Sequence, residues 1–147
     1  MQYQRGFTLI ELVTIIIILG IISVVALPRM SAGDDILAAE FRDKVVSSLR
    51  YAQKTASSHR RLVCVTFTAS SLTLQIARQK NVAACDADLP IPGAGGNVVS
   101  SRNPASIVFN PVPAALNFQP DGTANDRTLL IGGQPAIVII GATGHVR

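Results

Sequence analysis

Glu11 is the residue whose position most clearly demands a chemical explanation. It is the only ionisable side chain between Phe7 and Leu27, in a run dominated by Ile, Leu and Val. A helix rises about 1.5 Å per residue, so about 20 such residues can cross a bilayer. A carboxylate inside a membrane helix costs on the order of 2.5–3.5 kcal/mol and by default marks a functional site with a partner. The sequence therefore predicts a membrane-spanning helix over residues 7–29 with one acid near its start.

The other candidate reactive residues do not form a recognisable site. His59 and His145 have no Cys or Asp arrangement typical of a metal site or a catalytic triad. Gly93–Gly96 lacks the Lys-Ser/Thr of a phosphate-binding loop, and Asp34-Asp35 and Asp86-x-Asp88 offer too few oxygen ligands for a cation. We expect a cap at the first acidic pair and a loop at the second. No catalytic residue, metal or cofactor is predicted, and the chain is not expected to be an enzyme.

The two cysteines, Cys64 and Cys85, form a candidate disulfide. An even cysteine count in a chain with an export signal is typical of an oxidising compartment. A bond closing a loop of about 20 residues would contribute roughly 3 kcal/mol in the chain-entropy model. Two independent buried thiols are the alternative, and the sequence leaves both interpretations open.

Three ordinary interpretations of the N-terminus each leave something unexplained. A cleaved secretory signal has a shorter apolar core and an Ala-x-Ala site, and neither is present here. A lipoprotein needs a cysteine at its cleavage point, but none precedes Cys64. A plain signal anchor fits the length and gives no reason for Glu11.

The segment Gly6-Phe7-Thr8-Leu9-Ile10-Glu11-Leu12 resembles the processing motif of type IV prepilins and type II secretion pseudopilins. The resemblance implies that a prepilin peptidase removes a leader of residues 1–6 by cutting between Gly6 and Phe7, and methylates the new Phe7 amine. Gly6 suits such a cut, since a residue without Cβ allows close approach to the backbone.

The same resemblance implies a partner for Glu11 and a place in the cell. The carboxylate would pair with the Phe7 amine of a neighbouring subunit during filament assembly, and in a low dielectric such a pair is much stronger than in water. Pilin helices can bend where Gly20 and Pro28 stand. The subunit would sit in the bacterial inner membrane with its head in the periplasm, and then join a pilus or pseudopilus with other pilin subunits.

Residues 30–61 are expected to continue the helix as an amphipathic segment ending near Ser57. Apolar side chains recur every three or four residues, which places them on one helical face. Basic residues lie off this face, and those near the end suit the helix dipole. The apolar face consists of Leu37, Phe41, Val45, Leu49, Ala52 and Ala56.

Residues 62–147 are expected to form a globular head rich in β-strands. Alternating residues predict a hairpin of Leu62–Thr68 and Leu72–Ile76, followed by a loop over residues 79–96 that carries Cys85. Five more short strands are predicted at 97–101, 106–110, 115–119, 127–131 and 136–140. The predicted fold class is α+β, a type IV pilin-like fold with a long N-terminal helix packed on antiparallel sheets.

Two patterns refine the resemblance. Phe118-x-Pro120-x-Gly122 and the closing Gly144-x-Val146 resemble the C-terminal pattern of H-type (FimT-like) minor pilins. Leu27-Pro28-Arg29, together with the paired cysteines, resembles minor pilins of the mannose-sensitive haemagglutinin (MSHA) pilus. The function implied is structural: a minor pilin or pseudopilin near a filament tip.

The alternative function is binding of DNA or a surface ligand by the head, for DNA uptake or adhesion. The formal net charge is +4, but 13 basic residues are scattered along the chain, which favours an ordinary solvated surface. Some of the FimT-like minor pilins that this C-terminus resembles bind DNA through arginines around the closing Gly-x-x-Arg. By this resemblance the candidate contacts here are Arg60, Arg61 and Arg147. His145 stands where another arginine would strengthen the case, and a neutral histidine contacts phosphate weakly.

Overall fold

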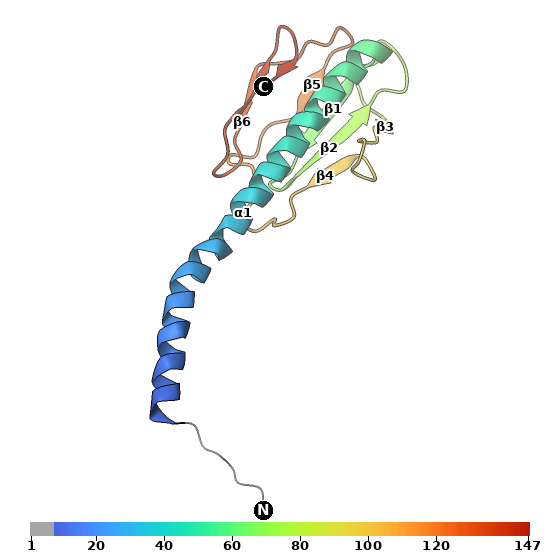
Figure 1. Cartoon of the computed structure of the whole chain (residues 1–147). Coiled ribbons are helices and arrows are strands. Elements are labelled where there is room, and N and C mark those ends of the chain that lie inside the picture. Colours follow the sequence, from blue (N-terminus) through green and yellow to red (C-terminus); the bar gives the residue numbers. More distant parts are fainter. Residues whose placement is uncertain (1–7) are drawn as a thin grey trace, which may run out of the picture. The chain divides into compact units, whose positions relative to one another are not determined.

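The computed structural model describes residues 8–147, apart from the side chains of residues 24–32. The predicted leader 1–6 and the cleavage residues Gly6 and Phe7 lie outside the described residues. The chain divides into two compact units, Met1–Gly33 and Asp34–Arg147. Each unit is described by itself, and Figure 1 labels α1 and the strands β1 to β6.

One helix, α1, runs from Leu9 to His59 and comprises 51 residues. It extends slightly beyond the predicted end near Ser57. Asp34 and Asp35 lie inside it, so the cap predicted there is wrong. Asp34 instead accepts hydrogen bonds from Asn103 Nδ2 at 3.1 Å and Ser106 Oγ at 3.4 Å, which tie a distant loop to the helix.

The first unit contains the apolar part of α1. Its backbone is helical through Gly20 and Pro28, but the side chain of Pro28 lies outside the described residues, so the kink stays a prediction. Among the described residues, no helical stretch meets the length and hydropathy needed to cross a bilayer. The predicted span 7–29 also includes Phe7 and the side chains of residues 24–29, which lie outside the described part of the structure.

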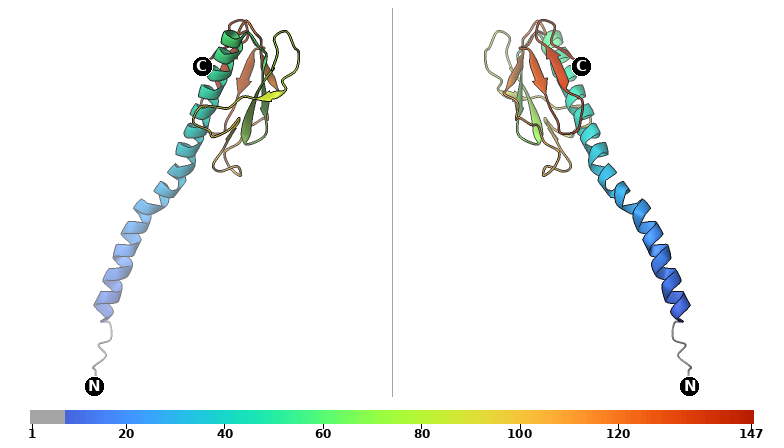
Figure 2. Two further views of the ribbon diagram at one scale, coloured as in Figure 1. Left: turned by 90° about the vertical axis from the view of Figure 1, so that its right-hand side faces the viewer. Right: turned by 90° about the vertical axis from the view of Figure 1, so that its left-hand side faces the viewer.

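In the second unit, the predicted face of α1 is buried from Phe41 to Ala56. Phe41 is 2% exposed, and Val45, Leu49, Ala52 and Ala56 are fully buried. Leu37, at the start of the predicted face, is only half-buried. Figures 1 and 2 show this part of the helix lying along the sheets of the head.

The larger sheet is antiparallel and is built on the predicted hairpin. β1 (Val63–Phe67) pairs with β2 (Ser71–Ile76), and the register sets Val65 opposite Leu74. Buried and half-buried residues alternate along both strands, which gives each strand one face toward the helix. The strand order is β3-β2-β1-β5, with β4 also pairing with β2; the bounds are β3 Ala87–Asp88, β4 Val98–Ser100 and β5 Leu116–Phe118.

The smaller sheet contains three strands in the order β6-β7-β8. Their bounds are Arg127–Leu129, Ile137–Ile140 and His145–Val146. Leu129, Ile137 and Ile139 are buried and contribute to the same hydrophobic core as the helix. The α+β prediction of a helix packed on antiparallel sheets is therefore confirmed.

Two predictions about the strands are wrong. Residues 106–110 form no strand, and Phe109 makes only an isolated bridge with Ile131. The N–H groups of Ser106 and Ile107 instead donate to the carbonyl of Asn103 at 3.3 and 2.9 Å, so a turn occupies the start of this segment. Ile107 and Phe109 of this segment are buried all the same, and the Phe109 ring packs 5.5 Å from the rings of Phe41 and Phe67. The short strand β3 lies inside the predicted loop 79–96. It was missed because a strand of two residues is too short to show an alternation of apolar and polar side chains.

The two C-terminal sequence patterns meet in space. A Cβ built on Gly144, whose φ is +64°, would overlap the carbonyl oxygen of Gly122 and lie 2.9 Å from Cγ of Gln53. Gly122 also has a positive φ, of +88°. The closing turn therefore approaches the Gly122 turn and the helix so closely that only glycine fits at Gly144.

We predict that Gly144→Ala lowers the free energy of unfolding of the head by about 2–4 kcal/mol, because it adds both a steric overlap and left-handed strain. Gly132→Ala is the matched control, since its added Cβ would meet no atom within 4 Å. Its effect should stay within about 0.5 kcal/mol. Urea unfolding of the purified chain, followed by circular dichroism, measures both values. Equal stability of the two variants would contradict the close approach.

Candidate functional site

Thr8 and Glu11 form a reciprocal cap at the start of α1. The backbone N–H and the hydroxyl of Thr8 both donate to Glu11 Oε2 at 3.0 Å. The backbone N–H of Glu11 donates in return to Thr8 Oγ1 at 3.3 Å. This is the capping-box arrangement, in which a Thr and a Glu three residues later satisfy each other's exposed donors. This cap was not predicted, although Thr-x-x-Glu before an apolar run is its signature.

The cap uses only one oxygen of the Glu11 carboxylate. Both bonds from Thr8 go to Oε2, and among the described residues no donor reaches Oε1. The neighbouring apolar side chains are open to solvent in this unit: Leu9 is 81% exposed, Ile10 67% and Leu12 60%. The site is thus a carboxylate that the described residues bind through one oxygen, in a helix whose apolar side chains are exposed.

In the head, Cys64 and Cys85 form a disulfide, so the interpretation as two independent thiols is excluded and the predicted bond is confirmed. A second tie lies beside it, since the Arg78 N–H donates to Asp86 Oδ1 at 2.7 Å. The Arg78 guanidinium also lies 3.8 Å from Asp86 Oδ2. Together these contacts close the neck of the loop that carries residues 79–84.

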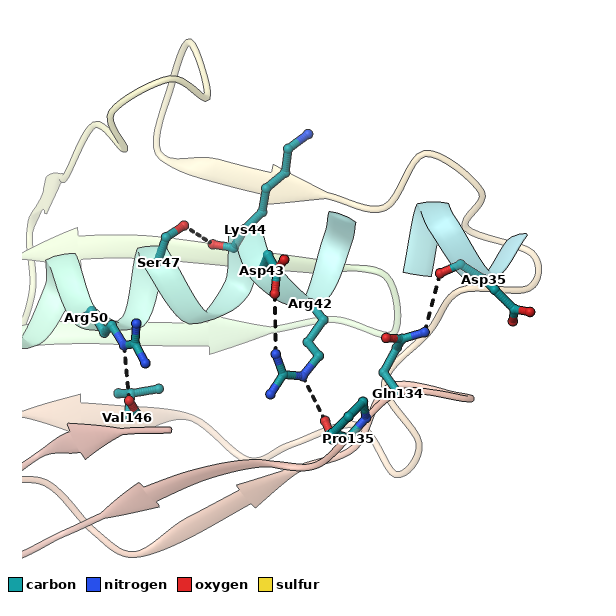
Figure 3. A network of polar contacts seen from close by, with 9 residues as sticks. All are labelled: Asp35, Arg42, Asp43, Lys44, Ser47, Arg50, Gln134, Pro135 and Val146. Carbon is teal, nitrogen blue, oxygen red and sulfur yellow. Dashed lines mark hydrogen bonds and ion pairs between the residues drawn. The ribbon is translucent and has the colours of Figure 1, made fainter. Parts of the chain in front are cut away.

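Arginine side chains hold the smaller sheet against α1 (Figure 3). Arg42 Nε donates to the carbonyl of Pro135 at 2.9 Å, and Arg50 Nε donates to that of Val146 at 3.1 Å. Gln53 adds a third such bond, to the carbonyl of Thr143 at 3.0 Å. Hydrogen bonds from a charged donor are stronger than neutral ones, so these cations contribute to packing.

Other basic residues are neutralised by acids. Glu40 accepts from Lys44 Nζ at 2.7 Å and lies 3.4 Å from Arg102 Nη2. The hydrogen bond from Lys44 is the main reason that the pKa of Glu40 is lowered below its usual value. Arg50 has no acidic partner within residues 8–147 and bonds to the Val146 carbonyl instead. The other cations without an acidic partner there could meet an anion: Lys54, Arg60, Arg61, Lys80, Arg127 and Arg147.

The structure does not gather the three candidate DNA contacts into one place. Arg147 extends the β7–β8 pairing, exchanging backbone hydrogen bonds with Val138 at 2.8 and 3.0 Å, and its neighbour Val146 contacts the helix at Arg50. Arg60 and Arg61 follow the end of α1, about 15 Å further along the helix axis. Arg50 instead contacts the C-terminal strand, through the carbonyl of Val146. Nothing in the sequence indicated this, because it depends on where the smaller sheet docks.

The histidines and acids form no metal site in the part of the chain that the structure describes, where no three His, Cys, Asp or Glu side chains come together. Of the site residues predicted from the sequence, Glu11 has a hydrogen-bonded carboxylate, and Cys64 and Cys85 form a disulfide. Gly6 and Phe7 lie outside the described residues.

Comparisons with known proteins agree with this assignment of the N-terminus. Residues 1–27 match the family described as the prokaryotic N-terminal methylation motif. Among solved structures, the chain is similar to the type IV minor pilin FimU of Pseudomonas aeruginosa, with 18% identity, a TM-score of 0.49, and coverage of 77% of this chain and 85% of that one. A search of curated proteins found no significant match.

The motif lies where the sequence predicted it, across the Gly6-Phe7 junction, Glu11 and the apolar run. Behind it stands an α+β head with a helix packed on antiparallel sheets. The chain thus combines the N-terminal methylation motif of prokaryotic proteins with an α+β head.

Proposed function

We propose that this chain is a minor pilin or pseudopilin, which is made as a membrane-anchored precursor and assembled into a filament through its N-terminal helix. The observation that carries the proposal is the methylation motif over residues 1–27. A prepilin peptidase would cut between Gly6 and Phe7 and methylate Phe7. Before assembly the subunit would lie in the bacterial inner membrane with its head in the periplasm. It would then join other pilin subunits near the tip of a filament. That filament would be a type IV pilus, of the MSHA type or another, or a type II secretion filament.

The state of Glu11 supports an assembly role. Its Oε2 is held by Thr8, which fixes the carboxylate at the helix start, while Oε1 accepts no bond from the described residues. The free oxygen can accept from the Phe7 amine of a neighbouring subunit, which exists only after cleavage. Either charge alone in an apolar setting is costly, so correct pairing strongly favours one register between subunits.

The exposed apolar residues support the same role. Ile15 to Ile18 are 42–58% exposed, and Leu19, Ile21 and Ile22 are exposed to a similar extent. A helix that is apolar on all sides requires an apolar environment all round. In this proposal lipid supplies that environment before assembly, and the helices of neighbouring subunits supply it in the filament.

The proposal predicts that Glu11→Ala leaves cleavage after Gly6 intact and reduces incorporation into filaments at least about tenfold, because the Phe7 amine loses its partner. Quantitative immunoblotting of sheared filaments against whole cells measures incorporation. Ser23→Ala is the matched control, since its hydroxyl bonds only to the Leu19 carbonyl within the same helix, and it should assemble normally. Normal incorporation of Glu11→Ala would refute the pairing role.

A second candidate function is binding of DNA or a surface ligand by the head. What favours it is the set of cations without an acidic partner, which includes all three candidate contacts, Arg60, Arg61 and Arg147. What weakens it is their separation, and His145 at a position where an arginine would add a phosphate contact.

A gel-shift titration with a DNA duplex tests this second function, using the full chain in detergent at about 50 and 200 mM salt. If Arg147 contacts phosphate, Arg147→Gln should weaken binding and reduce the slope of log K against log salt by about 1. Arg102→Gln removes a cation that is paired with Glu40 and serves as the control. No salt-sensitive retardation, or equal effects of the two variants, would rule out DNA binding through Arg147.

A further inference from the structure

An open hollow lies at the C-terminal end of α1, within the head unit. It has a volume of about 610 Å³ and is lined by Ser57, Arg60, Lys80, Asn81, Pro120 and Asp121. A second hollow of about 300 Å³ adjoins it, shares Asn81 and Pro120, and adds amide and apolar groups: Leu62, Val82, Ala83, Asn117 and Gln119. We call the two together the Arg60 trough.

Two residues of the trough have an unusual backbone. Arg60 has a φ of 52° and Asn81 a φ of 62°, and they are the non-glycine residues with positive φ in the described part of the chain. Arg60 follows directly on the helix end, where glycine is the residue usually favoured, and the Arg61 N–H bonds back to the Ala56 carbonyl at 3.2 Å. Strained residues of this kind gather at functional sites, and here both line the same hollow.

One side of the trough is a loop that covalent and polar contacts hold in place. Lys80 and Asn81 lie on the loop whose neck is closed by the Cys64–Cys85 bond and by the Arg78–Asp86 contacts. A loop held in place before binding loses less conformational entropy when a ligand arrives. The loop tip is thus an exposed but positioned element, suited to present Lys80 and Asn81 to a ligand.

The charges in the trough favour one negative group. Arg60 and Lys80 have no acidic partner among the described residues. Asp121 is held by Thr123, whose backbone N–H and hydroxyl donate to Oδ1 at 2.9 and 2.7 Å. These bonds, first that of the hydroxyl and then that of the N–H, lower the pKa of Asp121, so it stays ionised at neutral pH. Arg60 and Lys80 attract one anionic group, while the carboxylate of Asp121 repels a second anionic group.

The uncharged groups distinguish a sugar from a nucleic acid. None of the described residues that line the trough is aromatic, so a nucleic-acid base would find no stacking platform. Asp121 would also repel the next phosphate of a continuous backbone. In contrast, the amides of Asn81, Asn117 and Gln119 can donate to and accept from several hydroxyl groups. Ser57 Oγ donates its own proton to the Lys54 carbonyl at 3.0 Å and can still accept one hydrogen bond.

We propose that the Arg60 trough binds a carboxylated saccharide, with Arg60 and Lys80 receiving the carboxylate and Asp121 accepting hydrogen bonds from sugar hydroxyls. The inference goes beyond the filament role and does not rest on it, because the trough belongs wholly to the head. Neither Glu11 nor the Phe7 amine takes part.

Isothermal titration of the full chain in detergent tests the proposal with three probes: D-glucuronate, neutral D-glucose, and acetate. Glucuronate should bind at least tenfold more tightly than either of the others, since only it carries both the carboxylate and the hydroxyls. Arg60→Gly and Lys80→Gln should each weaken glucuronate binding by about tenfold, the effect of losing a charged hydrogen bond. Arg60→Gly suits the left-handed backbone, so its thermal unfolding midpoint should not fall.

Lys54→Gln is the control, because it removes the same charge from an unpaired lysine outside the trough. It should change glucuronate affinity by less than twofold, and Glu11→Ala should not change it at all. Equal losses in Lys54→Gln and Lys80→Gln, or equal binding of acetate and glucuronate, would overturn the proposal in favour of general charge attraction. Tighter binding of a DNA duplex or of polyglutamate through Arg60 and Lys80 would overturn it in favour of a nucleic acid or an acidic peptide.

Discussion

The buried face of α1 is the contact on which the rest of the head depends. Val45, Leu49, Ala52 and Ala56 are fully buried, and residues of both sheets join them in one core. Strands of two to six residues cannot form stable sheets alone, so they need the helix as a platform. The arginine bonds to the carbonyls of Pro135 and Val146 then fix where the smaller sheet lies on that platform.

The same helix serves two different environments because its residue pattern changes along its length. Between Leu37 and Ala56 the apolar residues occupy one face, which the sheets cover. Between Leu9 and Ile22 they surround the helix, and only an apolar environment can satisfy them. Glu11 stands at the far end of this second region, capped by Thr8 through one oxygen. In our proposal the other oxygen meets the amine that processing creates.

Much of this architecture could be predicted from the sequence, because local periodicity determined it. The buried helix face followed from the spacing of Phe41, Val45 and Leu49, and the first hairpin followed from alternation. The wrongly predicted strand at 106–110 had the right hydrophobic residues, but its first two N–H groups, those of Ser106 and Ile107, are used in a turn on the Asn103 carbonyl. The Arg60 trough could not be predicted from the sequence, because it depends on which loops meet in space. It also depends on the left-handed backbone of Arg60, and a left-handed residue at a helix end is predictable when it is a glycine but not when it is an arginine.

The central claim is that residues 1–6 are a leader and that Phe7 begins the mature subunit. Mass spectrometry of the N-terminal peptide, from protein isolated from the native host, tests it most directly. We predict a chain that starts at Phe7 and carries one methyl group on the amine. A chain that retains Met1, or that begins at any residue other than Phe7, would contradict the claim.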